Sequence, residues 1–131
     1  MNKDNLLTYW IESSDRDFVT MEHLFEKKDY HWALFMGHLV IEKLLKAFYV
    51  KNIDNKPPFI HNLLRLAEKS DLELSEEKKD CLATLTAFNI RARYDDYKLE
   101  FYKTCTIEYT TKWIDEIKGL RKWIKVQLLR S

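Results

Sequence analysis

The scarcity of glycine and proline is the feature that most constrains this chain, since each occurs only twice in 131 residues. Sheets and tight turns consume both residues, so a chain this poor in them favours long helices with few connections. Hydrophobic residues make up 46% of the sequence and aromatic residues 14%, which argues against disorder and supplies a core. We therefore expect an all-α protein that forms one domain over residues 1–131.

Apolar side chains recur at helical spacing along most of the chain. This periodicity predicts helices at about 5–28, 31–51, 61–68, 75–88 and 104–129. The Pro57-Pro58 pair cannot continue a helix, and Ser75 is a suitable N-cap. The second helix is the most apolar and should be central, with Gly37 allowing a neighbour to approach closely. The architecture expected is an up-and-down helical bundle of about four main helices plus one short helix.

Charge and cysteine content exclude several classes of protein. Lys plus Arg number 22 and Asp plus Glu 21, so the net charge is only +1. A general nucleic-acid binder is usually more basic, so any affinity for phosphate must come from a local patch. Cys81, Cys105 and the four histidines show no metal-ligand spacing, and we expect neither a metal nor a cofactor. With no signal-peptide core and no membrane-spanning run, we expect a cytoplasmic protein without a membrane partner.

Residues 90–97 carry the densest concentration of binding chemistry. The segment contains Arg91, Arg93, Tyr94, Asp95, Asp96 and Tyr97. A guanidinium donates two parallel hydrogen bonds to phosphate or carboxylate, and a phenol can stack on a base. The segment has too few apolar residues for an amphipathic helix, so we expect a connection between helices, and a site for a nucleotide or nucleic acid, if the protein has one, should lie here. The alternative is a structural network in which the two arginines pair with the two aspartates.

Three charged residues interrupt the apolar second helix, namely Glu42, Lys43 and Lys46. Glu42 and Lys46 form a favourable i,i+4 pair worth a few tenths of a kcal/mol, which by itself accounts for these two charges. In the alternative interpretation Glu42 is buried against Arg91 or Arg93 across the bundle and orients that guanidinium. These residues therefore join the segment 90–97 in the candidate site.

Two histidines and one tryptophan lie outside these charged groups. His38 lies one turn before Glu42 and is expected to be an interior histidine with its hydrogen bonds satisfied. His61 opens the third helix, where it would cap or pack, with a place in a binding cleft as the alternative. Trp123 falls off the inward stripe of the last helix, which indicates a residue at an interface.

Several segments together resemble one known family. They are Asp15-Arg16-Asp17-Phe18, residues 30–47 with Glu42-Lys43 and Lys46-Ala47, His61-Asn62-Leu63 and Ala92-Arg93-Tyr94. In this order they resemble the HEPN domain (higher eukaryotes and prokaryotes nucleotide-binding) over about residues 5–128. The chain departs from the family at His38, near which glutamine is usual, and at Asp95, where proline often follows the Arg-Tyr pair.

The resemblance implies a helical bundle that commonly forms a homodimer. Many members are encoded or fused with a minimal nucleotidyltransferase, some bind nucleotides, and others are metal-independent RNases of toxin–antitoxin and defence systems. The nuclease branch is similar in carrying an arginine followed, after four to six residues, by a histidine near the last helix. Neither arginine of segment 90–97 has such a histidine, and none occurs after His61. Arg16 and His23 have the spacing, but they lie in the first helix.

The sequence thus favours a non-catalytic nucleotide- or RNA-binding module, dimeric and working beside a nucleotidyltransferase. One alternative is a divergent metal-independent RNase, in which Asp95 or Asp96 would act as the base if burial raised its pKa. The other is a protein-interaction subunit without a ligand, in which segment 90–97 would be a salt-bridged brace. The candidate ligand-binding residues are Arg91, Arg93, Tyr94, Asp95, Asp96, Tyr97, Glu42, Lys43, Lys46 and His61.

Overall fold

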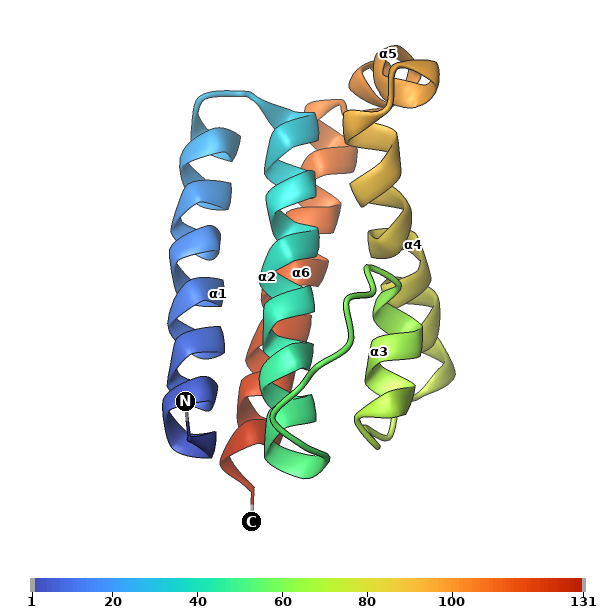
Figure 1. The fold of residues 1–131 in the computed structure, drawn as a ribbon. Coiled ribbons are helices and arrows are strands. Elements are labelled where there is room, and N and C mark those ends of the chain that lie inside the picture. Colours follow the sequence, from blue (N-terminus) through green and yellow to red (C-terminus); the bar gives the residue numbers. More distant parts are fainter. Residues whose placement is uncertain (1, 131) are drawn as a thin grey trace.

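The computed structural model describes residues 2–130, and within this range it contains helices and no strand (Figure 1). The helices are α1 (Lys3–Glu26), α2 (Tyr30–Asn52), α3 (Leu63–Lys69), α4 (Glu76–Arg93), α5 (Asp95–Thr104) and α6 (Ile107–Leu129). The all-α prediction is confirmed, and the four long helices and the short α3 correspond to those expected. None of the helices between residues 2 and 130 is long and apolar enough to cross a membrane.

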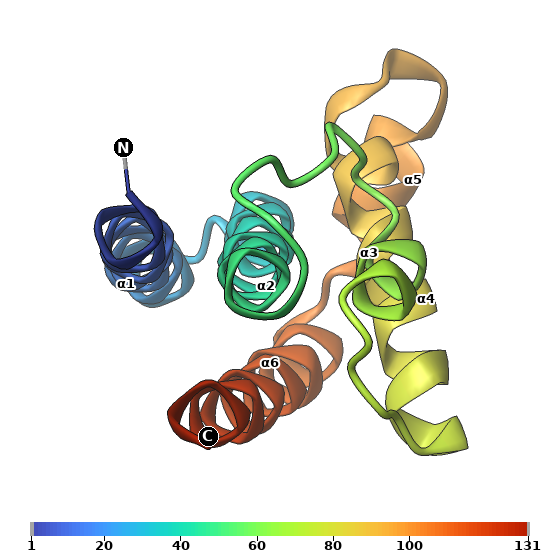
Figure 2. The same ribbon diagram turned by 60° about the horizontal axis from the view of Figure 1, so that its bottom comes forward.

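Helix α2 occupies the centre of the bundle, as its apolar composition predicts. It contacts α1 on one side and α3 and α4 on the other, with α6 packed along it (Figure 2). Leu34, Ile41, Leu44 and Leu45 on α2 are completely buried. A polar group on the buried face of α2 therefore lies in the interior and needs a partner.

Gly37 lies where α2 meets α1 and α6. A Cβ at this position would run into the side chain of Ile117 on α6 and lie 3.3 Å from Met21 Sδ on α1. Both neighbours are fully buried. The missing side chain thus lets three helices meet closely, which confirms the role expected for this glycine.

The start of α3 is fixed by two polar contacts. Asn62 Oδ1 accepts a hydrogen bond from the Arg65 backbone at 3.1 Å, and Thr86 Oγ1 on α4 accepts one from Leu63 N at 3.0 Å. Of the two roles expected for His61, capping or packing, capping is wrong, because Asn62 caps this helix. Ser75 caps α4 as predicted, because its Oγ accepts from Lys78 N at 3.2 Å.

Segment 90–97 is mostly helical, contrary to the expectation of a connection. Helix α4 continues to Arg93, only Tyr94 has an extended backbone, and α5 begins at Asp95. Acidic side chains in a first turn favour the positive end of the helix dipole, which suits the two aspartates. Phe101 is the only buried residue of α5. The prediction missed this helix because a single buried residue gives no apolar stripe.

Candidate functional site

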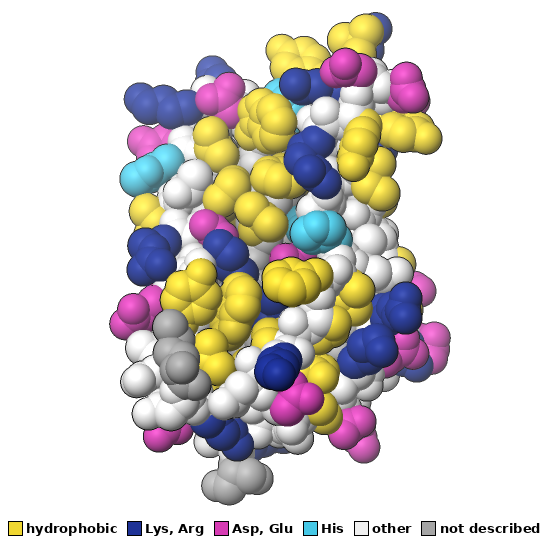
Figure 3. Space-filling model, in the orientation of Figure 1, with side chains coloured by type: hydrophobic (Ala, Val, Ile, Leu, Met, Phe, Trp, Pro, Cys, Tyr) yellow, Lys and Arg dark blue, Asp and Glu magenta, His cyan; other side chains and the backbone are white. Residues whose placement is uncertain are grey.

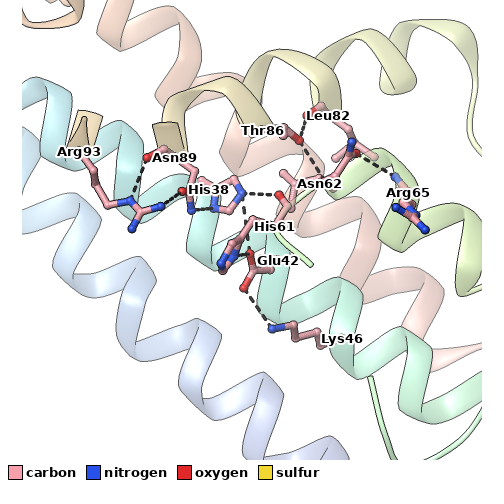
Figure 4. A network of polar contacts seen from close by, with 11 residues as sticks. His38, Glu42, Lys46, His61, Asn62, Arg65, Leu82, Thr86, Asn89 and Arg93 are labelled. Atoms are coloured by element: carbon pink, nitrogen blue, oxygen red, sulfur yellow. Dashed lines mark hydrogen bonds and ion pairs between the residues drawn. The ribbon is translucent and has the colours of Figure 1, made fainter. Parts of the chain in front are cut away.

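Glu42 is a carboxylate in the middle of the most apolar helix and is only 4% exposed. Its two oxygens have different partners (Figure 4): Oε2 accepts from Lys46 Nζ at 3.2 Å, and Oε1 from His61 Nδ1 at 2.8 Å. Lys46 is also buried, and its ammonium lies 5.1 Å from the centroid of the Trp10 ring. Burying a charge is costly unless it is paired, so this ion pair is what allows the carboxylate inside. The predicted i,i+4 pair is confirmed, whereas the expected contact with an arginine of segment 90–97 is not present.

His38 lies one turn before Glu42 and is fully buried. Its Nε2 is 3.0 Å from the His61 carbonyl oxygen, and its Nδ1 is 3.4 Å from Asn89 Nδ2 on α4. A carbonyl can only accept, so Nε2 carries the proton and Nδ1 accepts from the amide. Burial lowers the pKa of His38, which keeps this imidazole neutral. The expectation of an interior histidine with satisfied hydrogen bonds is confirmed.

Arg93 is exposed at the end of α4, and Asn89 holds it in place. Its Nε donates to the Asn89 carbonyl oxygen at 3.0 Å, and its Nη2 donates to Asn89 Oδ1. The guanidinium lies 5.7 Å from the centroid of the Phe35 ring and 5.4 Å from that of Tyr94. Among residues 2–130 no carboxylate forms an ion pair with it. The guanidinium is therefore oriented by the protein but has its charge available to a ligand.

These contacts form one chain of hydrogen bonds, which we call the polar chain: Arg93, Asn89, His38 and the His61 carbonyl (Figure 4). It begins on α4, crosses α2 and ends in the loop before α3. The direction of every bond is fixed, because arginine only donates and a carbonyl only accepts. The Asn89 amide consequently turns its oxygen toward the arginine and its nitrogen toward the histidine. The polar chain thus couples Arg93 to the loop that carries the His61 side chain.

Arg91 lies elsewhere, although it is only two residues from Arg93. Its Nη2 is 3.4 Å from Thr104 Oγ1 and 3.8 Å from Glu100 Oε1, and its guanidinium lies 4.7 Å from the centroid of the Phe101 ring. Two residues along a helix correspond to a turn of about 200° about its axis, so the two side chains leave on opposite sides. Arg91 therefore holds α5 against α4 and does not share a cleft with Arg93.

The remaining predicted residues are also separated from the polar chain. Lys43 pairs with Asp17 of α1, with 2.6 Å between Nζ and Oδ2. Asp95, Asp96 and Tyr97 are exposed on α5. The two aspartates form no ion pair with either arginine, so the structural network expected for segment 90–97 is wrong in its partners. Of the ten predicted residues, the structure forms two groups, Arg93 with Tyr94 and Glu42 with Lys46 and His61, which Asn89 and His38 connect.

Two aromatic rings, those of Phe35 and Tyr94, lie beside the guanidinium of Arg93. Phe35 beneath it packs edge to face on Trp32, with 5.7 Å between the ring centroids. On the face of the molecule shown in Figure 3, apolar side chains gather over α1 and α2 and beside α4, with cationic and histidine side chains among them. A flat ligand with a negative charge would find rings and a cation side by side here.

Sequence reasoning missed Asn89, although a spacing of four residues before Arg93 places both on one face of α4. It also gave His38 no role beyond the interior. Each is a link in the polar chain. Within residues 2–130, no three His, Cys, Asp or Glu side chains are grouped so as to hold a metal ion.

Comparison with known proteins agrees with this architecture. The HEPN domain family model matches residues 7–127, so the chain belongs to the HEPN domain family. The fold is similar to the crystal structure of TT1696 from Thermus thermophilus, with a TM-score of 0.80 over 98% of this chain and 100% of that one. The two sequences are 18% identical, so this likeness shows the fold alone. No curated protein sequence matches the chain.

Proposed function

We propose that this protein binds a phosphate group of a nucleotide or of single-stranded RNA through Arg93 and His61. The observation that carries the proposal is the Arg93 guanidinium, which is exposed, free of carboxylates among the described residues, and oriented by two hydrogen bonds to Asn89. A guanidinium held in one orientation binds phosphate well, because less side-chain entropy is lost when its parallel N–H groups engage the oxygens. His61, whose side chain is 63% exposed, adds a second polar group.

The neighbouring rings favour a nucleotide over a bare phosphate. Phe35 and Tyr94 are stacked near the Arg93 guanidinium, 5.7 Å and 5.4 Å from it, and Tyr94 is half-exposed. Stacking of a base on an aromatic side chain contributes about 1–3 kcal/mol per base and tolerates any base. The proposed ligand therefore places its phosphate on Arg93 and its base near Tyr94.

Other predicted residues act in support of this site. Glu42 fixes the ring of His61, and Lys46 compensates the buried carboxylate. Lys43 ties α2 to α1, and Arg91 holds α5 against α4. Asp95, Asp96 and Tyr97 are exposed on α5 and have no part in the proposed contacts.

A calorimetric titration with AMP, ATP and a short single-stranded RNA tests the proposal. We expect saturable binding that is lost in Arg93→Ala and kept in Arg65→Ala, a matched control whose exposed side chain points away from the polar chain (Figure 4). Helical circular dichroism must be unchanged in both variants. Equal binding by the two variants, or no binding by the unaltered protein, would contradict the proposal and favour a protein-interaction subunit without a ligand.

The second candidate function is cleavage of RNA without a metal. It is favoured by the Glu42–His61 contact, in which His61 Nδ1 donates to a carboxylate. Such an imidazole presents its Nε2 lone pair outward, and that atom can take a proton from a 2′-hydroxyl while an arginine stabilises the phosphorane charge. His61 lies in the loop before α3. It therefore differs from the family's nuclease histidine both in its place in the fold and in its spacing from an arginine.

Hydrolysis of a labelled RNA in the presence of a metal chelator distinguishes the two functions. If the protein is a divergent RNase, His61→Gln abolishes cleavage and leaves the binding of a non-cleavable 2′-deoxy analogue intact. Binding without cleavage supports the non-catalytic module instead. Arg93→Ala is purified in parallel as a control. If that sample is inactive, cleavage by the unaltered protein does not come from a contaminating nuclease.

We further propose that the protein is a homodimer and works with a nucleotidyltransferase partner, as is common among HEPN domains. Phe59, two residues before His61, is 99% exposed, which is unusual for a phenylalanine on a monomer. Light scattering should give twice the chain mass, and Phe59→Ser should shift it toward the monomer. Co-purification with the product of a neighbouring nucleotidyltransferase gene tests the partner.

A further inference from the structure

A groove runs between α4 and α6, away from the polar chain. The two helices diverge toward the end of the bundle where α4 begins (Figures 1 and 2), and the space between them is hollowed to a volume of about 340 Å³. It is lined by Glu77, Lys78 and Cys81 of α4 and by Asp115, Glu116, Gly119, Leu120 and Trp123 of α6. Cys81 and Arg93 are separated by about 18 Å along the α4 axis, so the groove is a separate feature.

The floor of the groove is apolar. Leu120 is buried beneath it, the indole of Trp123 forms one wall, and burial raises the pKa of the Cys81 thiol to about 11, which keeps the thiol uncharged. Gly119 widens the groove, because no atom lies within 4 Å of where its Cβ would be. A groove with apolar side chains between two helices can receive the apolar face of a third helix.

The rim of the groove is acidic. Glu77, Asp115 and Glu116 are exposed, and within residues 2–130 none of them has an ion-pair partner. The cation among the lining residues is Lys78, whose Nζ lies 4.7 Å from the centroid of the Trp123 ring. Lys112 of α6 also lies close enough for its charge to act on Cys81, so three carboxylates outnumber two ammonium groups, which favours positive charge over an acidic partner.

We propose that this groove docks a cationic amphipathic helix of a partner protein. Apolar side chains at i, i+3 or i+4, and i+7 of that helix would fill the floor beside Gly119 and Trp123. Lysines or arginines flanking its apolar stripe would face the three carboxylates. This surface also accounts for Trp123, which lies off the inward stripe of α6 and takes no part in the phosphate site.

The probe is a labelled helical peptide of about 16 residues with leucines at the spacing just given and lysines on both flanks, titrated by fluorescence anisotropy. Two companion peptides carry glutamates in place of the lysines, or the same residues in an order without helical periodicity. We expect saturable one-to-one binding of the lysine peptide alone. Its affinity should fall as salt is raised, because the rim charges are exposed and screened.

Gly119 provides a matched pair of variants. Gly119→Leu fills the groove without a clash, because the space is open, and should lower the affinity for the lysine peptide by about tenfold or more. Gly119→Ala adds one methyl and should bind within about twofold of the unaltered protein. A double variant, Glu77→Lys with Glu116→Lys, reverses two rim charges and should also lower the affinity for the lysine peptide. Absence of saturable binding, equal binding of a companion peptide, or unchanged binding by Gly119→Leu would each overturn the proposal, and urea denaturation confirms that each variant is folded.

Discussion

Mild acid should destabilise this protein through His38. The imidazole is fully buried, its Nε2 donates to the His61 carbonyl, and its Nδ1 accepts from Asn89. Protonation would place an N–H of the ring opposite the amide N–H of Asn89. Flipping the amide does not help, because its nitrogen would then face Arg93, which can only donate. The folded state therefore resists protonation, in keeping with a pKa that burial lowers, although the His61 carbonyl and the charge of Glu42 oppose this shift.

The size of the effect follows from linkage. A group whose pKa is lower in the folded state contributes stability that is complete above the unfolded value of 6.5 and is lost as the pH falls. If the folded-state imidazole is neutral throughout, lowering the pH from about 7 to about 5 costs at most about 2 kcal/mol, from about 1.36 kcal/mol per pH unit. Burial also lowers the pKa of His31, with Lys98 adding to the effect, so total acid sensitivity will exceed that of His38 alone.

Urea denaturation of the unaltered protein and of His38→Gln at about pH 7 and about pH 5 isolates this contribution. Glutamine can still donate to the His61 carbonyl but does not titrate, so the variant should lose about 1–2 kcal/mol less than the unaltered protein between the two pH values. His23→Gln, at an exposed position on α1, should behave like the unaltered protein. An identical pH dependence in all three proteins would refute the argument.

Two further predictions concern packing and charge. Gly37→Ala should destabilise the fold by about 1–3 kcal/mol, because its methyl meets Ile117, whereas Gly119→Ala should stabilise it by about 0.5–1 kcal/mol, since helical glycine has more entropy to lose; urea midpoints that moved in the same direction would contradict this. Arg91→Ala should lower the melting temperature yet leave AMP affinity within about twofold. Arg93→Ala should instead abolish AMP binding and leave the melting temperature unchanged. Calorimetric titration and thermal melts of both variants measure these effects.

The fold was predictable to the extent that apolar stripes reveal it. Helices α1, α2, α4 and α6 each bury a long face, and their periodicity predicts them to within a few residues, except that α4 continues past its expected end at Phe88 to Arg93. Helix α5 was not predictable in this way, because it depends on the anchor Phe101 and on the contacts of Arg91. These contacts join residues that no local pattern relates.

The candidate site was predictable in its ingredients and not in its arrangement. A carboxylate in an apolar helix signals a buried pair, and Lys46 at four residues supplies it. The sequence does not show that His61, nineteen residues from Glu42, is the second partner, because the loop path decides it. Nor does it show that Asn89 lies between Arg93 and His38, since this depends on how closely α4 packs on α2.

The fixed direction of the polar chain limits what it can transmit. A proton relay needs groups that can exchange donor and acceptor roles, but here the first group has no lone pair to offer and the last has no proton to give. Proton transfer along it is therefore blocked, and any reaction at His61 must exchange its protons with solvent or substrate. The polar chain can instead transmit a movement of its side chains. An anion that pulls the Arg93 guanidinium outward draws on the Asn89 amide, then on the His38 ring, and so on the loop at His61. An anion bound at Arg93 would thus shift the position of the loop at His61.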